Sequence, residues 1–321
     1  MPVLSRIIDE QLPQPLRLDR YVSEKIKILS RSQIKTRNLK ALINGNDAKL
    51  SKIVKNGDSI ELTWDEIPAV DIIPEDIPLA VIFENEDCIV VNKAQGMVVH
   101  PGAGNRHGTL VNALYFRRLQ MNALHETEFP ADRREISLRS GIVHRLDKDT
   151  SGVIIASYND SAHSFLSQQF KSRVTRKNYI AVVQGIPRES KGRIETFIAR
   201  DPKNRKRFTV SSNGKTALTF YKVIRSWMNY SFVLLSPKTG RTHQLRVHMR
   251  HIGHPVMGDT VYGNIDKLFP EATLMLHSKS LAITLPGETE KRVFSSEIPE
   301  RFSNVMQKLN RMNVNGQPIY S

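Results

Sequence analysis

The pattern of apolar and polar positions divides the chain into a short N-terminal block and a long C-terminal block. Between about residues 15 and 64, apolar residues recur first at helical spacing and then in short strand-like runs separated by Asn-Gly turns. Residues 65–78 form an acidic stretch with three prolines, which remove backbone donors and favour extended chain, so a linker is predicted there. Residues 79–310 alternate strand-like and helix-like patterns and are predicted to form one α+β domain. The polar residues 311–321 are predicted to be a flexible tail.

The most informative local pattern is a charged turn between two apolar runs. Gly141-Ile142-Val143 precedes it and Val153-Ile154-Ile155-Ala156 follows it, so the pattern predicts a strand, a turn and a second strand. The turn itself is His144-Arg145-Leu146-Asp147-Lys148-Asp149-Thr150-Ser151-Gly152. A carboxylate such as Asp147, held among basic residues, could be a nucleophile or a metal ligand. The alternative is a solvated hairpin turn, because Asp and Gly are common turn residues.

Two further segments carry candidate site residues. Residues 92–104 contain three glycines together with Lys93 and His100, and their spacing is neither that of a dinucleotide fingerprint nor that of a phosphate-loop ATPase. This segment is interpreted as a loop on the substrate side, with a structural turn as the alternative. Residues 177–185 alternate with period two and close on a glycine, which predicts a strand. Its Tyr179 is either a core residue or a ring on which an extruded base stacks.

The segment 239–255 predicts a helix that begins at a Thr242 cap and ends at Gly253 and Pro255. Arg246 and Arg250 share one face of this helix, so it can direct guanidinium groups at an anion. Its four histidines do not share a face and no cysteine accompanies them, so no metal site is predicted; they are residues 243, 248, 251 and 254. A second helix is predicted to start at an Asp160 cap and to serve core packing.

Composition indicates a polyanionic partner. The 321 residues contain 47 Lys and Arg against 32 Asp and Glu, a net charge of +15. The chain has no run of about eighteen apolar residues, no basic amphipathic helix and no lipidation signal, so nucleic acid is favoured over a membrane surface. Cys88 is the only cysteine, which excludes internal disulfides and thiol-based zinc sites. Without an apolar secretion signal, a cytoplasmic location is predicted. A monomer is the default expectation.

The N-terminal block carries one sign of charge. From residue 25 to residue 55 there are nine basic residues and one acidic residue, which favours a phosphate-binding surface over a mixed solvated face. The motifs Arg17–Val22, Ser30–Lys35, Leu42–Gly45 and Val54–Asp58 resemble the small S-four-like α/β RNA-binding fold of ribosomal proteins, tRNA synthetases and RNA-modifying enzymes. The residues expected to contact RNA are Arg31, Lys35, Arg37 and Lys40.

The long block resembles the RluA family of RNA pseudouridine synthases. The residues that carry the resemblance are Gly141–Gly152, Asn92–Gly104, Lys177–Gly185, Gly240–His248 and Gly253–Asp259, in the family's order. Residues 98–105 and 147–150 are most similar to members that act on ribosomal RNA of the large subunit.

The resemblance implies a fold, a reaction and a set of roles. The fold would be a central mixed, mostly antiparallel sheet with flanking helices, and the reaction would turn uridine into pseudouridine in structured RNA. Nothing is oxidised and no group is donated, so neither a cofactor nor a metal is expected. Asp147 would be the catalytic carboxylate, paired with Arg246, while Tyr179 stacks on the displaced base and shuttles its proton. Arg145 would fill the space that the base vacates. Further substrate-binding residues would be His144, Lys93, His100, Arg241 and His243.

Two other functions compete with this one. A noncatalytic RNA-binding or ribosome-assembly factor could keep the fold, and the intact set of Asp147, Tyr179 and Arg246 argues against it. A nuclease could use Asp147 and Asp149 as metal ligands, but Lys148 lies between them and no further acids follow. Asp149 is expected to have a structural role in the turn.

Overall fold

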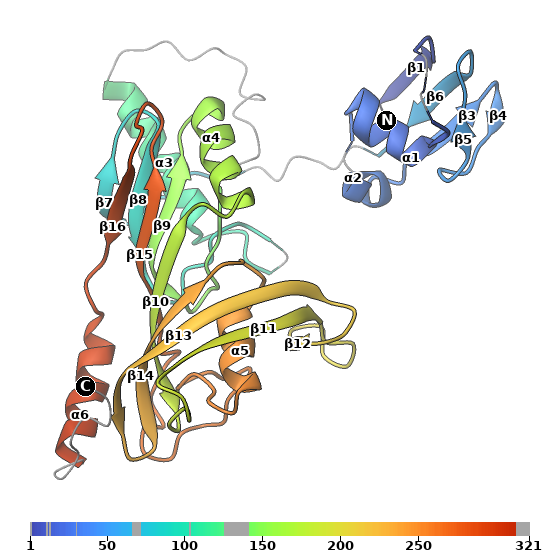
Figure 1. Cartoon of the computed structure of the whole chain (residues 1–321). Helices are drawn as coiled ribbons and strands as arrows, with labels where there is room; N and C mark the ends of the chain where they lie inside the picture. Colours follow the sequence, from blue (N-terminus) through green and yellow to red (C-terminus); the bar gives the residue numbers. More distant parts are fainter. Residues whose placement is uncertain are drawn as a thin grey trace. The chain divides into compact units, whose positions relative to one another are not determined.

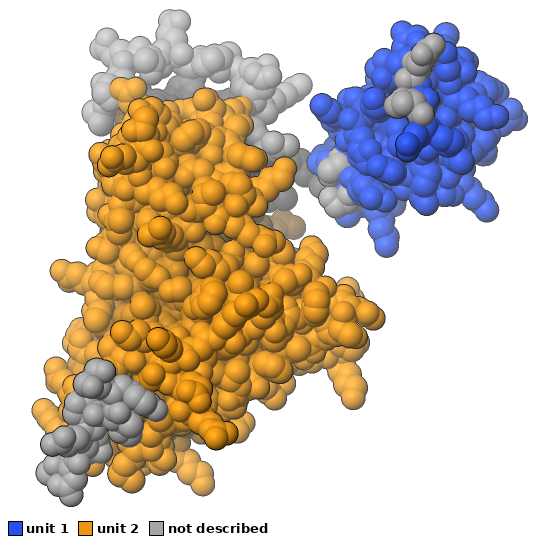
Figure 2. Space-filling view, in the orientation of Figure 1, with its two compact units in different colours: residues 1–71 blue, residues 72–321 orange. Residues whose placement is uncertain are grey.

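The structure is a computed structural model, and it describes residues 2–10, 12, 14–29, 31–65, 72–102, 104–124 and 141–312. The chain divides into two compact units, residues 1–71 and 72–321, and each is described by itself (Figure 2). The middle of the predicted linker and nearly all of the predicted tail lie outside the described residues. The part of the predicted linker that is described next to the second unit, from residue 72 on, packs against that unit, because the Asn112 side chain donates to the carbonyl of Ile73.

The N-terminal unit is a small α/β structure. Its main sheet has the strand order β1-β6-β3-β4 and is antiparallel throughout; the strands are β1 (Val3–Ile7), β3 (Lys40–Ile43), β4 (Asn46–Asp47) and β6 (Ser59–Thr63). A second pair consists of β2 (Leu16–Arg17) and β5 (Ile53–Val54), and the helices are α1 (Leu18–Arg20), the π-helix η1 (Tyr21–Ile26) that continues it, and α2 (Arg31–Thr36). The unit starts before the predicted boundary at residue 15, because β1 pairs with β6 and the chain then buries Ile8.

The C-terminal unit is built on one large sheet (Figure 1). Its order among the described strands is β12-β11-β13-β14-β10-β15-β9-β8-β7, with β16 also paired to β15. The pairing is antiparallel except between β15 and β9, which are parallel, so the predicted mixed, mostly antiparallel sheet is confirmed. The strands are β7 (Ala80–Glu84), β8 (Cys88–Lys93), β9 (Ser151–Ser157), β10 (Arg176–Gln184), β11 (Lys191–Arg200), β12 (Phe208–Val210), β13 (Lys215–Trp227), β14 (Tyr230–Pro237), β15 (Leu276–Thr284) and β16 (Lys291–Ser295).

Helices flank this sheet. They are α3 (Leu110–Leu124), α4 (Asp160–Lys171), α5 (Gln244–His251) and α6 (Glu300–Met312). Helix α4 lies against β9 and β15, and α5 lies against β12 and β13 (Figure 1). Helix α6 inserts Phe302 and Leu309 into the main core, and its Asn310 accepts a hydrogen bond from the Trp227 indole at 2.8 Å. Every residue of β9 is buried, as expected for an apolar run covered on both faces.

Three local predictions are corrected, those of one strand and of two helix caps. Residues 141–143 do not form a strand; Ile142 makes only an isolated bridge to Ala156. The reason is that the backbone amide of Ile155 donates to Nε2 of the His144 ring at 3.1 Å. In a regular strand pair this amide would donate to a backbone carbonyl of the neighbouring strand. Helix α4 is capped by Asn159, whose side chain accepts the Ala162 amide at 2.8 Å, and not by Asp160.

The cap of α5 also differs from the prediction. The helix begins after His243, whose backbone is left-handed with φ 56°, and no side chain, Thr242 included, caps it. The predicted end is confirmed, because the last helical residue is His251 and Gly253 has φ +87°. The left-handed step at His243 is a conformation that costs energy for a residue other than glycine, and it occurs beside the candidate site.

Candidate active site

The turn that carries Asp147 leads directly into β9 and is held by its backbone. The amide of Thr150 donates to the Asp147 carbonyl at 3.1 Å and closes the turn. The next carbonyl, of Lys148, accepts the Gly96 amide at 3.0 Å, and that of Asp149 accepts the Gln95 side chain at 2.9 Å. The Asp147 side chain is 17% exposed, so the backbone is fixed while the carboxylate remains accessible.

Lys93 is an anchor for this turn. Its ammonium donates to the carbonyls of Ala94 at 2.9 Å, Met97 at 2.8 Å and Lys148 at 3.0 Å. The residue is only 1% exposed, and burial lowers the pKa of its ammonium to about 8. All three donors of the ammonium are thereby used. Lys93 was expected to bind the substrate, and here its ammonium holds the backbone on both sides of the turn.

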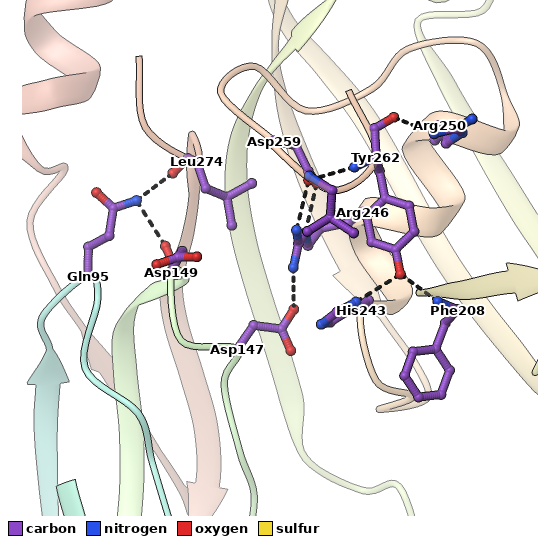
Figure 3. A network of polar contacts seen from close by, with 11 residues as sticks. Gln95, Asp147, Asp149, Phe208, His243, Arg246, Arg250, Asp259, Tyr262 and Leu274 are labelled. Carbon is purple, nitrogen blue, oxygen red and sulfur yellow. Dashed lines mark hydrogen bonds and ion pairs between the residues drawn. The ribbon is translucent and has the colours of Figure 1, made fainter. Parts of the chain in front are cut away.

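Arg246, in the first turn of α5, lies between two carboxylates (Figure 3). Its Nη1 is 3.5 Å from Oδ2 of Asp147. On the other side it makes a bidentate pair with Asp259, with Nε–Oδ2 and Nη2–Oδ1 both 2.7 Å. The predicted pairing of Asp147 with Arg246 is therefore present, although the two residues come from distant parts of the chain.

Tyr262 continues this network. The Arg246 guanidinium lies over its ring, 5.1 Å from the centroid. Its hydroxyl accepts the Phe208 amide at 2.7 Å and lies 2.8 Å from Nδ1 of His243. Arg250, which was expected to face an anion together with Arg246, donates instead to the carbonyl of Tyr262 at 2.8 Å.

A cavity of about 450 Å³ opens beside Asp147. Among the described residues that line it, Asp147 is the only carboxylate. Seven cationic side chains line the same cavity: Arg145, Lys171, Arg173, Lys177, Lys238, Arg241 and Arg246. Such a cavity suits an anionic ligand, and its size is within the range of about 300–1,000 Å³ that is common for small-ligand sites.

Most of the predicted site residues line this cavity. Tyr179, Arg145, His144, Arg241 and His243 are all among its walls, whereas Lys93 and His100 are not. The His100 ring is in an exposed loop and lies 2.9 Å from the carbonyl of Pro101 through Nδ1. The segment 92–104 thus contributes mainly backbone support to the turn, as Lys93 does.

Two ring side chains of the cavity are neutral. Tyr179 is in β10 and 8% exposed, and burial raises the pKa of its hydroxyl to about 12. His144 stacks on Phe170 with ring centroids 4.4 Å apart, and burial lowers the pKa of its imidazole to about 3. The neutral His144 ring can therefore keep accepting the amide of Ile155 at ordinary pH.

Several cavity residues were missed from the sequence. Helix α4 was assigned to core packing, yet Phe170 and Lys171 at its end line the cavity. The signal that would have found them is the basic run that follows, Lys171-Ser172-Arg173-Val174-Thr175-Arg176-Lys177. Asp259 and Tyr262 were also missed as parts of the site, since only the folding of the chain brings them to Arg246.

Three of the four histidines of the segment 239–255 make separate hydrogen-bond contacts, and that of His243 is with the Tyr262 hydroxyl. His248 lies 3.0 Å from the Thr196 hydroxyl and 2.9 Å from the Thr219 hydroxyl, whereas His254 lies 3.0 Å from the carbonyl of Gln184. Within the described residues, no three His, Cys, Asp or Glu side chains gather as a metal site. In Figure 3 Asp147 points toward Arg246, while Asp149 lies beside Gln95.

The cations predicted to bind RNA lie in the N-terminal unit. Arg31 and Lys35 are on α2, Arg37 follows that helix, and Lys40 begins β3. Arg31, Lys35 and Lys40 are exposed, and Arg37 is half-buried. None of the helices in the described ranges is long and apolar enough to cross a membrane.

Comparison with known proteins points to one family. The family model for RNA pseudouridylate synthase matches residues 87–251, which include Asp147, Tyr179 and Arg246. The chain is 45% identical to Ribosomal large subunit pseudouridine synthase D of Borreliella burgdorferi over 89% of this chain and 87% of that one. It is 38% identical to the protein of the same name from Blochmanniella floridana, over 82% of this chain and 80% of that one. The solved structure of Human RNA Pseudouridylate Synthase Domain Containing 1 superposes with a TM-score of 0.53 and 26% identity, covering 77% of this chain and 99% of that one.

The fold and the site define an RNA-modifying isomerase. The chain belongs to the RNA pseudouridylate synthase family. Within that family, its similarity to the two proteins named Ribosomal large subunit pseudouridine synthase D extends over most of its length.

Proposed function

We propose that this enzyme isomerises uridines of large-subunit ribosomal RNA and that Asp147 is its catalytic carboxylate. The observation that carries the proposal is the cavity in which one accessible carboxylate faces seven cations. Two relatives whose names specify the ribosomal large subunit support the choice of RNA. The cationic walls suit the phosphates of an RNA chain, and they compensate the cost of keeping one carboxylate ionised in a partly buried place.

The chemistry assigns a role to each central side chain. The reaction breaks the N1–C1′ bond of uridine, turns the base, and forms a C5–C1′ bond; C5 loses a proton and N1 gains one. Asp147 attacks the sugar or assists departure of the base, and it holds the intermediate in place. Arg246 fixes the carboxylate from 3.5 Å. Tyr179 stacks on the displaced base, and its neutral hydroxyl can donate or accept a proton in relay.

The target nucleotide must leave its helix to reach Asp147. Unstacking and unpairing one base costs on the order of a few kcal/mol. Arg145 is exposed next to the cavity, and no ion pair to another described residue holds it there. Arg145 enters the space that the base vacates and offsets part of this cost. The reaction consumes no oxidant and no group donor, so the enzyme works without a cofactor.

The N-terminal unit acts as an S-four-like RNA-binding domain. Its chain from residue 25 to residue 55 carries nine basic residues and one acidic residue, which suits a phosphate backbone. Arg31, Lys35, Arg37 and Lys40 are the contacts, and they come from one helix, the residue after it and the following strand. The domain contributes affinity for RNA, whereas the chemistry belongs to the C-terminal unit.

The test is tritium release from C5-labelled uridine in transcribed large-subunit ribosomal RNA. The Asp147→Asn variant should release none above background, because the amide cannot replace the carboxylate, while its melting temperature and RNA affinity stay unchanged. Tyr179→Phe keeps the ring and should lower the rate while retaining RNA binding. Asp149→Asn is the matched control, since this neighbouring side chain is exposed, and it should keep most of the rate.

The outcomes separate the competing functions. Full tritium release by Asp147→Asn would remove Asp147 from the mechanism. Binding without release by the unaltered protein would favour the noncatalytic factor. Strand cleavage that stops with a chelator, and that needs both Asp147 and Asp149, would favour the nuclease.

A further inference from the structure

Arg246 makes contacts of unequal strength to its two carboxylates. Its bidentate pair with Asp259 has both nitrogen–oxygen distances at 2.7 Å, the geometry of a strong charge-assisted pair. Its contact with Asp147 is single and 3.5 Å long. The guanidinium of Arg246 therefore interacts more strongly with Asp259 than with Asp147.

Asp259 is held in place for this contact. Its side chain is 0% exposed, and its Oδ1 also accepts the amides of Val261 and Tyr262, both at 2.9 Å. Burial alone would raise the pKa of the carboxyl, but the hydrogen bonds and charge of Arg246 hold that pKa below its usual value, so Asp259 is ionised. The residue before Asp259 packs tightly against the backbone, because a Cβ at Gly258 would lie 2.2 Å from the carbonyl oxygen of Thr273.

Resting on the proposed function, we propose that Asp259 is a positioning residue for the reaction. It fixes the plane of the Arg246 guanidinium and takes most of its charge. Asp147 is then oriented by Arg246 without being drawn into a close bidentate pair, which leaves its oxygens free to react with the sugar. A carboxylate locked in a tight pair would be a poorer nucleophile, because the same lone pairs would already accept hydrogen bonds.

Tyr262 is the second part of the same positioning element. Its ring supports the face of the guanidinium, 5.1 Å from the centroid to Cζ of Arg246. Its hydroxyl accepts the Phe208 amide, so its own proton is available for Nδ1 of His243, 2.8 Å away. His243 lines the cavity, and the element therefore connects the cavity wall to the residue that orients Asp147.

The Asp259→Asn variant tests the positioning role. Asn is nearly the same size and keeps an oxygen for the two backbone amides, but it removes the charge and presents an NH₂ to the guanidinium. We expect kcat for tritium release to fall by about 100-fold, as for a misplacement of about 1 Å at a reacting group, while KM and RNA affinity stay unchanged.

Asp266→Asn is the matched control. Asp266 is also buried and, like Asp259, accepts two backbone amides, those of Leu268 and Phe269. Its side chain accepts the Tyr230 hydroxyl where that of Asp259 accepts the Arg246 guanidinium. We expect this variant to lose stability while keeping the kcat of the unaltered enzyme. A kcat loss in Asp266→Asn as large as that in Asp259→Asn would overturn the proposal.

A double variant shows whether Asp259 acts through Arg246. Lysine cannot make the bidentate pair, so in an Arg246→Lys background Asp259→Asn should lower kcat no further. Additive losses would contradict the proposal. If Asp259→Asn does not fold, Tyr262→Phe takes its place, with an expected fall of about tenfold in kcat and no further fall in the Arg246→Lys background. Unchanged kcat in Tyr262→Phe would then overturn the proposal. Absence of tritium release by the unaltered enzyme would instead refute the proposed function.

Discussion

Buried histidines in this chain are neutral hydrogen-bonding groups. His277 is 0% exposed, and its Nδ1 and Nε2 each lie 2.8 Å from a serine hydroxyl, of Ser151 and Ser296. His248 is also 0% exposed and lies between two threonine hydroxyls. Burial lowers the pKa of each imidazole to about 4. Both rings therefore stay uncharged in the folded protein at pH values where a free imidazole begins to take up a proton.

These shifts predict a steep loss of stability in acid. Below the unfolded pKa of about 6.5, the unfolded chain binds a proton at each histidine that the folded chain does not bind. The stabilisation is complete above that pH and is lost as the pH falls toward about 4, the folded value for both residues. Each histidine should contribute a slope of about 1.4 kcal/mol per pH unit.

Urea unfolding between pH 4.5 and 6.5 checks this expectation. The His277→Gln variant keeps hydrogen-bonding groups but does not titrate, so its free energy of unfolding should fall less steeply with acid than that of the unaltered chain. The difference in slope, and not the absolute stability, is the quantity to compare. Equal slopes in the two proteins would show that His277 takes up its proton in both states.

The place of a single residue in the site could be predicted where a sequence motif contains it. It could not be predicted where it depends on a contact with a residue far away in the chain. Asp147, Arg246 and Tyr179 were found from the sequence, and the structure brings all three to one cavity. Their roles in the reaction remain proposals. Asp259 could not be assigned a contact, because nothing in its local sequence names Arg246 as its partner. The contacts of Lys93 could not be predicted either, because its three carbonyl acceptors come together only in three dimensions.

At the scale of elements, the junction of β9 and β15 helps to place the turn that carries Asp147. The two strands run parallel and pair only at their first residues, with Ser151 opposite His277 and Gly152 opposite Ser278. Gly152 has φ +113°, and a Cβ there would lie 2.2 Å from the Ser278 carbonyl oxygen. Only glycine fits at this position, which is the last residue of the turn and lies three residues after Asp149.

Gly152→Ala should therefore destabilise the protein by about 3 kcal/mol through backbone strain and overlap together. Gly287→Ala is the control, because Gly287 has φ +77° with no atom within 4 Å of the added Cβ. It should cost about 1 kcal/mol from strain alone. Thermal unfolding of both variants checks the difference, and equal losses would mean that the β9–β15 contact relaxes without cost.

Elements with a strong period were predicted well, and boundaries set by tertiary contacts were not. The strand at 177–185 is confirmed as β10, and the end of α5 is confirmed. Residues 141–143 have the composition of a strand, but the His144 side chain takes the Ile155 amide, and pairing stops at Ile142. The cap of α4 was placed one residue too late, since Asn159 is as good a cap as Asp160. The cap of α5 was placed one residue too early, since the left-handed backbone of His243 has no signal in the local pattern.

At the scale of the whole molecule, charge separates affinity from catalysis. Replacing Arg31, Lys35, Arg37 and Lys40 together with Gln should weaken RNA binding without altering kcat at saturating RNA. The slope of log affinity against log salt should become shallower by about 0.7–0.9 for each phosphate that these side chains no longer neutralise. Filter binding at several salt concentrations measures this slope. An unchanged slope would show that these four cations do not bind RNA phosphates.

The two-unit organisation and the α+β class followed from patterning, but the extent of the first unit did not. Strand β1 lies before the predicted boundary, and its pairing with β6 joins positions from 52 residues apart (Ile7 with Ser59) to 60 residues apart (Val3 with Thr63). Local periodicity contains no information about such a partner. The order of the large sheet was beyond reach for the same reason, although the family resemblance supplied its mixed, mostly antiparallel character, which is confirmed.

The position of β15 has a consequence for translation. This strand lies between β10 and β9, so it joins the two halves of the sheet, although it is synthesised after almost all of the other strands. A nascent polypeptide that has emerged from the ribosome only as far as Asp259 already contains Asp147 and Arg246, but it lacks the strand that brings their halves together. We therefore expect no modification of RNA by the nascent chain before β15 has left the ribosome.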